Sequence, residues 1–92
     1  MSVRVLIPAS LRKFCDGLDV VDVEATDVRE ALAALESQHP GVTSKLCDDK
    51  GNVRRFINIY ANQEDIRFQQ QLDTPLVEGN ELQIIPAIAG GR

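Results

Sequence analysis

The chain ends in an uncharged segment that carries two consecutive glycines, Gly90 and Gly91, before a single arginine, Arg92. Because glycine has no side chain, a Gly-Gly backbone can thread a narrow channel and present a carboxylate to another protein. A terminal Gly-Gly is a weak signal on its own, since linkers and tags contain it too. Its meaning depends on the domain that precedes it.

The other residues that are able to do chemistry are poorly placed for it. The one histidine, His39, precedes Pro40 at an expected helix end, where a capping or solvated role is the simplest interpretation. Cys15 is followed by Asp16, whose charge would raise the pKa of the thiol and weaken it as a nucleophile. No Ser-His-Asp arrangement and no glycine-rich phosphate loop can be built. We therefore expect no catalytic residues, no metal site and no bound cofactor.

Composition narrows the class of protein further. Ten Lys and Arg against fourteen Asp and Glu give a net charge of −4, which argues against a nucleic-acid partner. Cys15 and Cys47 lack the paired spacing of a zinc site, so two reduced thiols are expected. The adjacent carboxylates Glu64 and Asp65 lie in a turn signal and are expected to be solvated. No apolar run is long enough to span a membrane and no export signal is visible, so we expect a cytoplasmic protein.

The elements that position the tail follow from the periodicity of apolar residues. Val28, Ala31, Leu32 and Leu35 form one helical stripe, preceded by the capping residues Thr26 or Asp27 and ended at residues 39–41. Residues 42–46 allow one further helical turn, and residues 9–18 and 72–77 are expected to be loops, the second with a possible turn at Pro75. Alternation predicts five strands, at residues 3–7, 21–24, 54–61, 66–68 and 81–85.

This order of elements predicts an α+β domain with a β-grasp (ubiquitin-like) fold. One main helix would cover one face of a mixed four- to five-stranded sheet. The first two strands would form a hairpin, and the last strand would lie parallel to the first at the centre of the sheet. We expect residues 1–86 to form this domain and residues 87–92 to form a flexible C-terminal tail.

The sheet would leave one face uncovered. Alternation places Ile57 and Ile59 under the helix, beside residues 82 and 84, so Phe56, Tyr60 and Ile85 would lie on the opposite face. These three side chains come from strands that the fold makes neighbours. They would form an apolar patch, which usually marks a surface for a partner protein.

The ending Pro-Ala-Ile-Ala-Gly-Gly, together with the strand before it, resembles the MoaD/ThiS family of ubiquitin-like sulfur carriers. The resemblance covers residues 3–91. Within the family, residues 55–68 most resemble the carriers used for protein-bound cysteine synthesis. The resemblance implies that an E1-like adenylyltransferase uses ATP to adenylate the carboxylate of Gly91, while Gly90, Ala89 and Ile88 thread into that enzyme. Transfer from a sulfur donor would then form a thiocarboxylate.

The resemblance also implies partners, but leaves the pathway open. In cysteine synthesis the sulfur acceptor would be a cysteine synthase-like enzyme, and a metalloprotease would release the product. The alternatives are the small subunit of molybdopterin synthase, which would bind the large subunit of that enzyme, and a carrier for thiamine synthesis or tRNA thiolation. A ubiquitin-like modifier of other proteins, or a plain interaction module, remains a further alternative.

Arg92 departs from the family pattern, because active carriers end at the glycine. The Gly91 carboxylate is tied up in a peptide bond to Arg92. Either a protease removes Arg92 from a precursor, or Arg92 is a vector-derived remnant. The precursor is favoured because a single residue is an unusual tag. The 92-residue form is expected to be inert until Arg92 is removed.

Overall fold

Alternating valines build the first hairpin of the fold. In the computed structural model, which describes residues 2–86, β1 (Ser2–Leu6) pairs antiparallel with β2 (Val20–Glu24). The side chains of Val3 and Val5 are fully buried, whereas Arg4 between them is exposed. The period of two that was visible in the sequence therefore sets which face of this hairpin enters the core.

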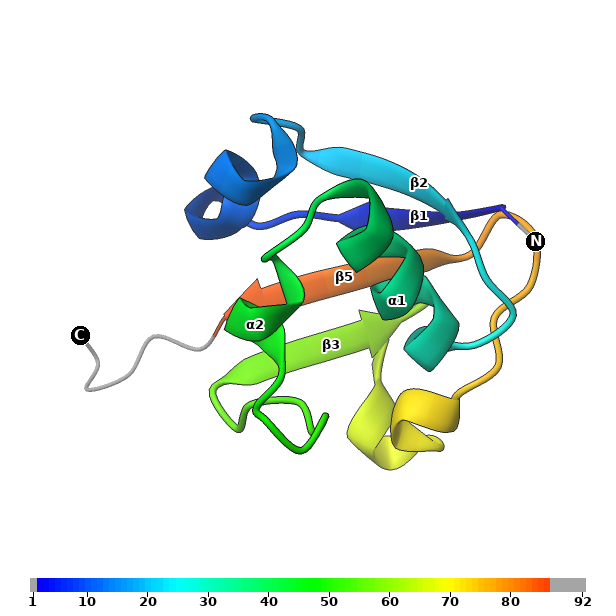
Figure 1. The fold of residues 1–92 in the computed structure, drawn as a ribbon. Coiled ribbons are helices and arrows are strands. Elements are labelled where there is room, and N and C mark those ends of the chain that lie inside the picture. The colour runs from blue at the N-terminus through cyan, green and yellow to red at the C-terminus, as the bar shows by residue number, and fades with distance from the viewer. Residues whose placement is uncertain (1, 87–92) are drawn as a thin grey trace.

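The last strand completes the centre of the sheet. β5 (Glu81–Pro86) lies parallel to β1 and antiparallel to β3 (Ile57–Ala61), and the short β4 (Glu64–Asp65) pairs with the end of β3. The strand order is β2-β1-β5-β3-β4 (Figure 1). The predicted five-stranded mixed sheet, with the last strand parallel to the first in its centre, is confirmed.

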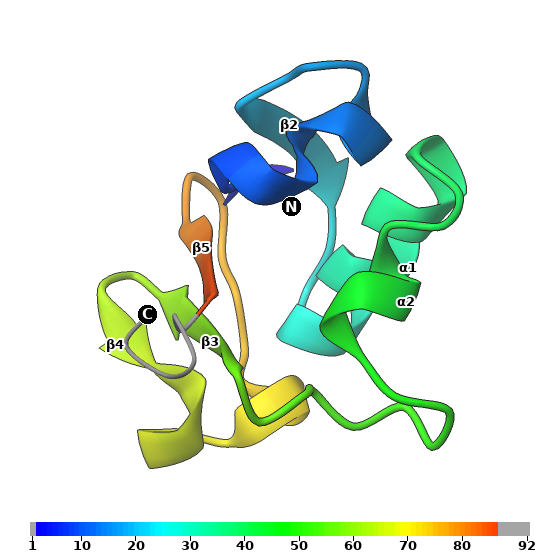
Figure 2. The same ribbon diagram turned by 90° about the vertical axis from the view of Figure 1, so that its left-hand side faces the viewer.

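One main helix covers one face of this sheet. α1 (Val28–Gln38) begins at Asp27, whose carboxylate accepts a hydrogen bond of 2.8 Å from the backbone N–H of Glu30. The Asp27 cap is therefore confirmed, and the Glu30 carboxylate reaches back to accept from the backbone N–H and the hydroxyl of Thr26, one residue before the cap. α1 and the short α2 (Thr43–Leu46) lie on the same side of the sheet (Figure 2).

The core lies between this helical layer and the inner face of the sheet. The predicted helical stripe of four residues is buried in it, and so are the inner side chains of β3 and β5. The largest of its fully buried apolar side chains are Leu35, Leu46, Ile59, Leu82, Val3, Val5, Val28 and Val42.

The segment between β1 and β2 is more regular than predicted. Residues 9–18 were expected to form a loop or turn, but Ala9–Cys15 form a 3₁₀ helix, η1. Leu11 and Cys15 project from it into the core, and the Arg12 side chain donates a 3.0 Å hydrogen bond to the Ile7 carbonyl. Burial of these two side chains outweighs the turn signals in the sequence.

β3 begins later than predicted. The strand was expected from Arg54, but it starts at Ile57. The backbone N–H of Arg54 donates to the carbonyl of Leu46, and its guanidinium donates to the carbonyl of Ser44, so α2 holds this residue away from the sheet. A turn through Arg55 and Phe56 then leads into the strand.

The strand predicted at residues 66–68 is wrong. Ile66–Phe68 form a 3₁₀ helix, η2, because the Asp65 carboxylate accepts a hydrogen bond from the backbone N–H of Arg67 and turns the chain. Ile66 is buried and Phe68 is 81% exposed, whereas a strand would place both on one face. The helical turn expected at Pro75 lies earlier, at Gln71–Asp73 (η3).

A single carboxylate holds α2 in place. Glu36 accepts hydrogen bonds from the backbone N–H groups of Gly41 and Thr43, at 2.8 and 3.0 Å, and from the Thr43 hydroxyl at 2.7 Å. The Gly41 N–H, followed by the two Thr43 donors, holds the pKa of Glu36 below its ordinary value. The ionised form of Glu36 is therefore the one that stabilises the fold.

Because folding lowers the pKa of Glu36, we expect the folded state to lose stability in acid. The stabilisation is complete above the unfolded-state pKa of glutamate, about 4.3, and disappears as the pH falls through the lower pKa of the folded state. We expect Glu36→Gln to be less stable than the parent at neutral pH and to lose less stability on acidification. Urea unfolding at pH 7 and pH 3 measures this. The control is Glu64→Gln, since the exposed Glu64 side chain has no hydrogen-bond partner among residues 2–86, and a parallel loss in both variants would contradict the assignment.

Within residues 2–86, no helix has the length and apolar character needed to cross a membrane.

Candidate functional site

The face of the sheet opposite α1 carries a row of side chains that crosses four strands. In the register of the sheet, Val20 pairs with Leu6, Leu6 with Gln83, and Gln83 with Tyr60. Residues that lie opposite each other in neighbouring strands project from the same face. Ile85, two positions beyond Gln83 on β5, is 37% exposed and is a diagonal neighbour of Tyr60. We call Val20, Leu6, Tyr60 and Ile85 the open-face patch.

A second row, behind the open-face patch, is charged. Arg4 pairs with Asp22 on one side and with Glu81 on the other, and its guanidinium lies 3.4 Å from the Glu81 carboxylate. Towards the C-terminal end of β5 the open face carries the apolar patch together with the uncharged Gln83 and Asn58, and towards the opposite end it is charged. Partner proteins commonly dock on apolar patches with such a polar border.

The C-terminal end of β5 is bordered by two grooves. The first has a volume of about 400 Å³ and runs along the open-face patch, where Leu6, Val20, Ile85 and Pro86 line it. The second has a volume of about 360 Å³ and lies at the end of the sheet. Phe56, which is 48% exposed, lines this second groove from the turn before β3.

Two of the three docking residues predicted from the sequence lie on the open face, and the third lies at the end of the sheet. Tyr60 and Ile85 are brought together on the open face, as diagonal neighbours in the β3–β5 pairing. Phe56 precedes the first residue of β3 and lies at the end of the sheet, near Pro86. Pro86, the last described residue, lines both grooves, the first with Ile85 and the second with Phe56, whereas Tyr60 lies further along the sheet, opposite Gln83.

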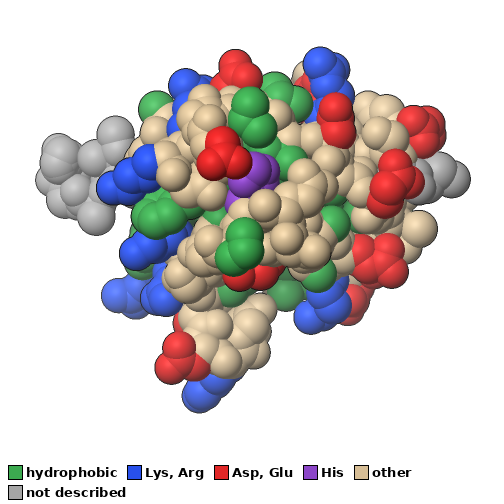
Figure 3. Space-filling model, turned by 45° about the horizontal axis from the view of Figure 1, so that its top comes forward, with side chains coloured by type: hydrophobic (Ala, Val, Ile, Leu, Met, Phe, Trp, Pro, Cys, Tyr) green, Lys and Arg blue, Asp and Glu red, His purple; other side chains and the backbone are tan. Residues whose placement is uncertain are grey.

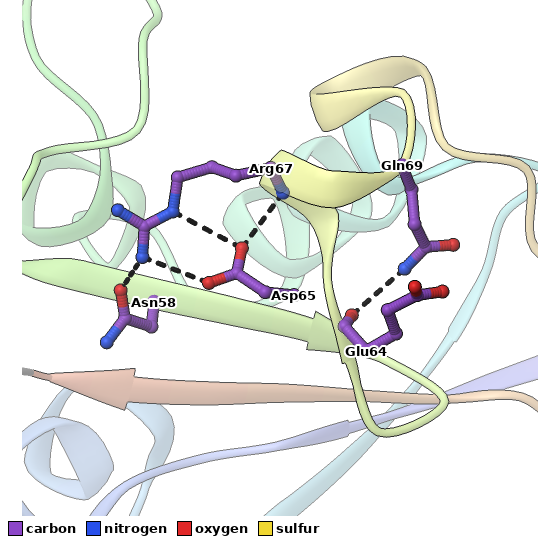
Figure 4. A network of polar contacts seen from close by, with 5 residues as sticks. All are labelled: Asn58, Glu64, Asp65, Arg67 and Gln69. Carbon is purple, nitrogen blue, oxygen red and sulfur yellow. Dashed lines mark hydrogen bonds and ion pairs between the residues drawn. The ribbon is translucent and has the colours of Figure 1, made fainter.

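The edge of the sheet beside Tyr60 is fixed by a polar network (Figure 4). The Arg67 guanidinium donates to both carboxylate oxygens of Asp65, at 3.3 and 3.0 Å, and also to the side-chain carbonyl of Asn58. These Arg67 hydrogen bonds lower the pKa of Asp65. Asp65 was expected to be solvated together with Glu64, but its side chain is only 10% exposed and is ion-paired. The network anchors the turn that follows β3.

The histidine and the two cysteines are buried or partly buried in the fold. His39 caps the C-terminus of α1, with its backbone N–H donating to the Leu35 carbonyl, and it is buried rather than solvated. Both cysteines are free, and burial, followed by the charge of Asp16, raises the pKa of the Cys15 thiol. In the described part of the chain, no three His, Cys, Asp or Glu side chains are grouped to hold a metal ion.

The residues predicted to carry the chemistry itself, Gly91, Gly90, Ala89 and Ile88, lie outside the described residues, as does Arg92. The structure therefore describes the surface around Pro86, and residues 87–92 remain the subject of the proposal below.

Two members of the open-face patch were missed in the sequence. Leu6 was expected to be buried and Val20 was not considered, yet both are half-buried on the open face. Strict alternation from Val3 and Val5 would have placed Leu6 on this face. Its pairing with Val20 depends on the register of the hairpin, which the turn between the strands does not reveal.

Comparisons with known proteins identify the family of this chain. The ThiS family model matches residues 5–91. The sulfur carrier protein CysO of Mycobacterium tuberculosis is 37% identical over 93 residues, which cover 99% of this chain and 100% of that protein.

Solved structures agree with the sequence comparison. A chain in the crystal structure of the BexX/CysO complex of Amycolatopsis orientalis has a TM-score of 0.91 and 38% identity, over 97% of this chain and 99% of that chain. Small archaeal modifier protein 1 of Haloferax volcanii has a TM-score of 0.84 and 29% identity, over 99% of this chain and 100% of that chain. The predicted β-grasp fold and the predicted resemblance are both confirmed, and the chain belongs to the ThiS family of ubiquitin-like proteins.

Proposed function

We propose that this chain is a sulfur carrier for cysteine biosynthesis, and that Gly91 is the residue that carries the sulfur. Removal of Arg92 would free the Gly91 carboxylate. An E1-like adenylyltransferase would adenylate it and convert it to a thiocarboxylate, with Gly90, Ala89 and Ile88 threading into that enzyme. The folded domain supplies the surface that the partners bind, the C-terminal segment carries the sulfur, and the partner enzymes supply the catalysis.

One observation carries this proposal. The ThiS family match covers residues 5–91, so it continues through Gly91 and stops before the arginine that follows. The match to a named sulfur carrier protein over 99% of this chain supports the same assignment, and that relative's name, CysO, supports cysteine biosynthesis as the destination.

The chemistry needs little from the carrier. A carboxylate oxygen of Gly91 would attack the α-phosphate of ATP and release pyrophosphate, which leaves an acyl-adenylate. Sulfide sulfur from a donor would then displace AMP to give the thiocarboxylate. This group is a competent nucleophile near neutral pH, so its sulfur can attack Cβ of an activated serine bound to a cysteine synthase-like partner. The activating group would leave, and the thioester formed would rearrange by an S-to-N acyl shift to an amide between Gly91 and cysteine. A metalloprotease would then release the cysteine.

The open-face patch is the surface proposed to dock on the E1-like enzyme. The Amycolatopsis orientalis relative was crystallised in a complex with BexX, which supports docking of a chain with this fold onto a partner protein. Tyr60 and Ile85 offer apolar contacts on the open face, Ile85 directly before Pro86, and Phe56 extends this surface around the end of the sheet. Docking there would place residues 87–91 next to the partner's active site.

A ubiquitin-like modifier is the second candidate function. It is favoured by the similarity to small archaeal modifier protein 1, which is 29% identical over 99% of this chain. In that case the activated Gly91 would be joined to lysine side chains of target proteins.

The two functions differ in the bond that Gly91 finally makes. The full chain with an N-terminal affinity tag would be recovered from cells of the source organism, and its C-terminal peptides identified by mass spectrometry. A carrier leaves Gly91 as a thiocarboxylate or bonded to cysteine, whereas a modifier leaves it bonded to a lysine ε-amino group. A matched chain lacking Gly91 and Arg92 is the control. Recovery of Gly91 only in its bond to Arg92 would contradict both functions.

A further inference from the structure

Basic side chains gather at the end of the molecule where β5 finishes. η1, α2 and the turn before β3 meet at this end, next to Pro86 (Figure 1). In the space-filling view, Lys and Arg side chains gather on this side and Asp and Glu side chains gather on the opposite side (Figure 3). We call Lys13, Lys45 and Arg54 the basic rim. These cations come from three separate segments of a chain with a net charge of −4.

Two members of the basic rim share one aromatic ring. The ammonium groups of Lys13 and Lys45 each lie 5.4 Å from the centre of the Phe14 ring. The face of an aromatic ring attracts cations at such distances, so Phe14 favours the placement of both ammonium groups at this end of the molecule. Among residues 2–86, neither lysine has a carboxylate partner, and both side chains are exposed.

The third member is held by a backbone carbonyl. Arg54 donates from Nε and from its terminal nitrogen to the carbonyl of Ser44, at 3.2 and 3.0 Å. A carbonyl orients the guanidinium but leaves its charge uncompensated. Arg54 and Lys45 line the 360 Å³ groove at the end of the sheet with Phe56 and Pro86, and no carboxylate lines that groove.

Three arginines elsewhere on the described fold are ion-paired with carboxylates. Arg4 pairs with Glu81, Arg29 with Asp73 at 3.2 Å, and Arg67 with Asp65. Lys50 and Arg55 also have no ion pair among residues 2–86, so the basic rim is distinguished by the closeness of its cations to one ring and one groove. Asp16 and Asp19 follow η1 in the chain, where Asp16 approaches His39 and Asp19 lines the neighbouring groove, and the charges of Asp48 and Arg54 both act on Cys47.

We propose that the basic rim is a second docking element, which binds an acidic surface on the E1-like enzyme beside the entrance to its active site. This inference rests on the proposed function, since it names the chemistry of the partner at the same end of the molecule. Unpaired positive charges fit a surface of Asp and Glu side chains, and the groove lined by Phe56 accepts an apolar side chain between them. Charge complementarity of this kind mainly raises the association rate and fixes the orientation of binding.

The test compares charge reversal at the rim with charge reversal elsewhere. Association of the full chain with the E1-like adenylyltransferase of the source organism would be followed by stopped flow at low and high salt. We expect the double variant Lys13→Glu/Lys45→Glu to bind at least about tenfold more slowly at low salt, with a weaker salt dependence. The control is Arg29→Glu/Lys50→Glu, which makes the same change in net charge away from the rim. Equal slowing in both variants, or slowing in neither, would overturn the inference.

A second measurement tests, without the enzyme, whether the basic rim binds an acidic peptide. If the parent chain does not bind the enzyme, the proposed function fails, and a titration with a polyglutamate peptide followed by ¹⁵N-edited NMR still tests the rim. We expect shifts confined to the residues around Lys13, Lys45 and Arg54, and their loss in the rim variant. Uniform or absent shifts would overturn the inference. A stronger response to inorganic tripolyphosphate would also overturn it, by indicating a phosphate ligand instead of an acidic protein surface.

Discussion

Ile59→Ala should lower the free energy of unfolding by about 2–5 kcal/mol, the range measured when a large aliphatic side chain is removed from a packed core. Ile59 is 1% exposed, and it pairs with Ile84 on β5, which is itself buried under the helical layer. The deleted atoms would leave a cavity beside Ile84 in the core on the inner face of the sheet, where the packed neighbours can collapse only partly. Urea unfolding followed by circular dichroism measures the loss.

Tyr60→Ala is the matched control, because it alters the next residue of the same strand on the opposite face. Tyr60 is only partly buried, so its removal should leave the fold largely stable. It should instead weaken docking on the E1-like enzyme, by about 2 kcal/mol or roughly thirtyfold in affinity if Tyr60 is an anchor of the interface. A chain that unfolds on Tyr60→Ala but tolerates Ile59→Ala would mean that the two faces are reversed.

The second large effect concerns the length of the C-terminal segment. A chain ending at Gly90 still ends in glycine, but its carboxylate falls short by one residue, about 3.3–3.6 Å of extended backbone. Displacement of a reacting group by even 1 Å can cost about a hundredfold in rate. We therefore expect adenylation of the chain ending at Gly90 to be at least about a hundredfold slower than that of the chain ending at Gly91. Pyrophosphate released per unit time measures this, and equal rates would show that the register of the tail is not set by Gly91.

Much of the fold could be predicted because it follows from patterns of apolar residues that repeat along whole strands and helices. The valines of β1 alternate over several residues, and the α1 stripe repeats over two turns, so burial follows from spacing alone. The errors occur where a single local hydrogen bond competes with the pattern. The hydrogen bond from the Arg67 N–H to Asp65 makes residues 66–68 helical instead of extended. The hydrogen bond from Arg54 to the Ser44 carbonyl keeps Arg54 out of β3, so that the strand begins later.

The surface around the tail was only partly predictable. Tyr60 and Ile85 follow from alternation within strands, so their shared face could be deduced. Lys13, Lys45 and Arg54 come from three segments whose spacing along the chain carries no shared period. They meet only because η1, α2 and the turn before β3 converge at one end of the sheet.

The most direct test of sulfur carriage at Gly91 is the intact mass of the protein after reaction. Chains ending at Gly91 and at Arg92 would each be incubated with ATP, a sulfide donor and the E1-like adenylyltransferase, then analysed by mass spectrometry. We predict that the chain ending at Gly91 gains the mass of an oxygen-to-sulfur exchange, located in its C-terminal peptide, and that the chain ending at Arg92 gains none until a protease removes the arginine. Equal modification of both chains, or modification of neither in the presence of an enzyme that adenylates another carrier, would contradict this account.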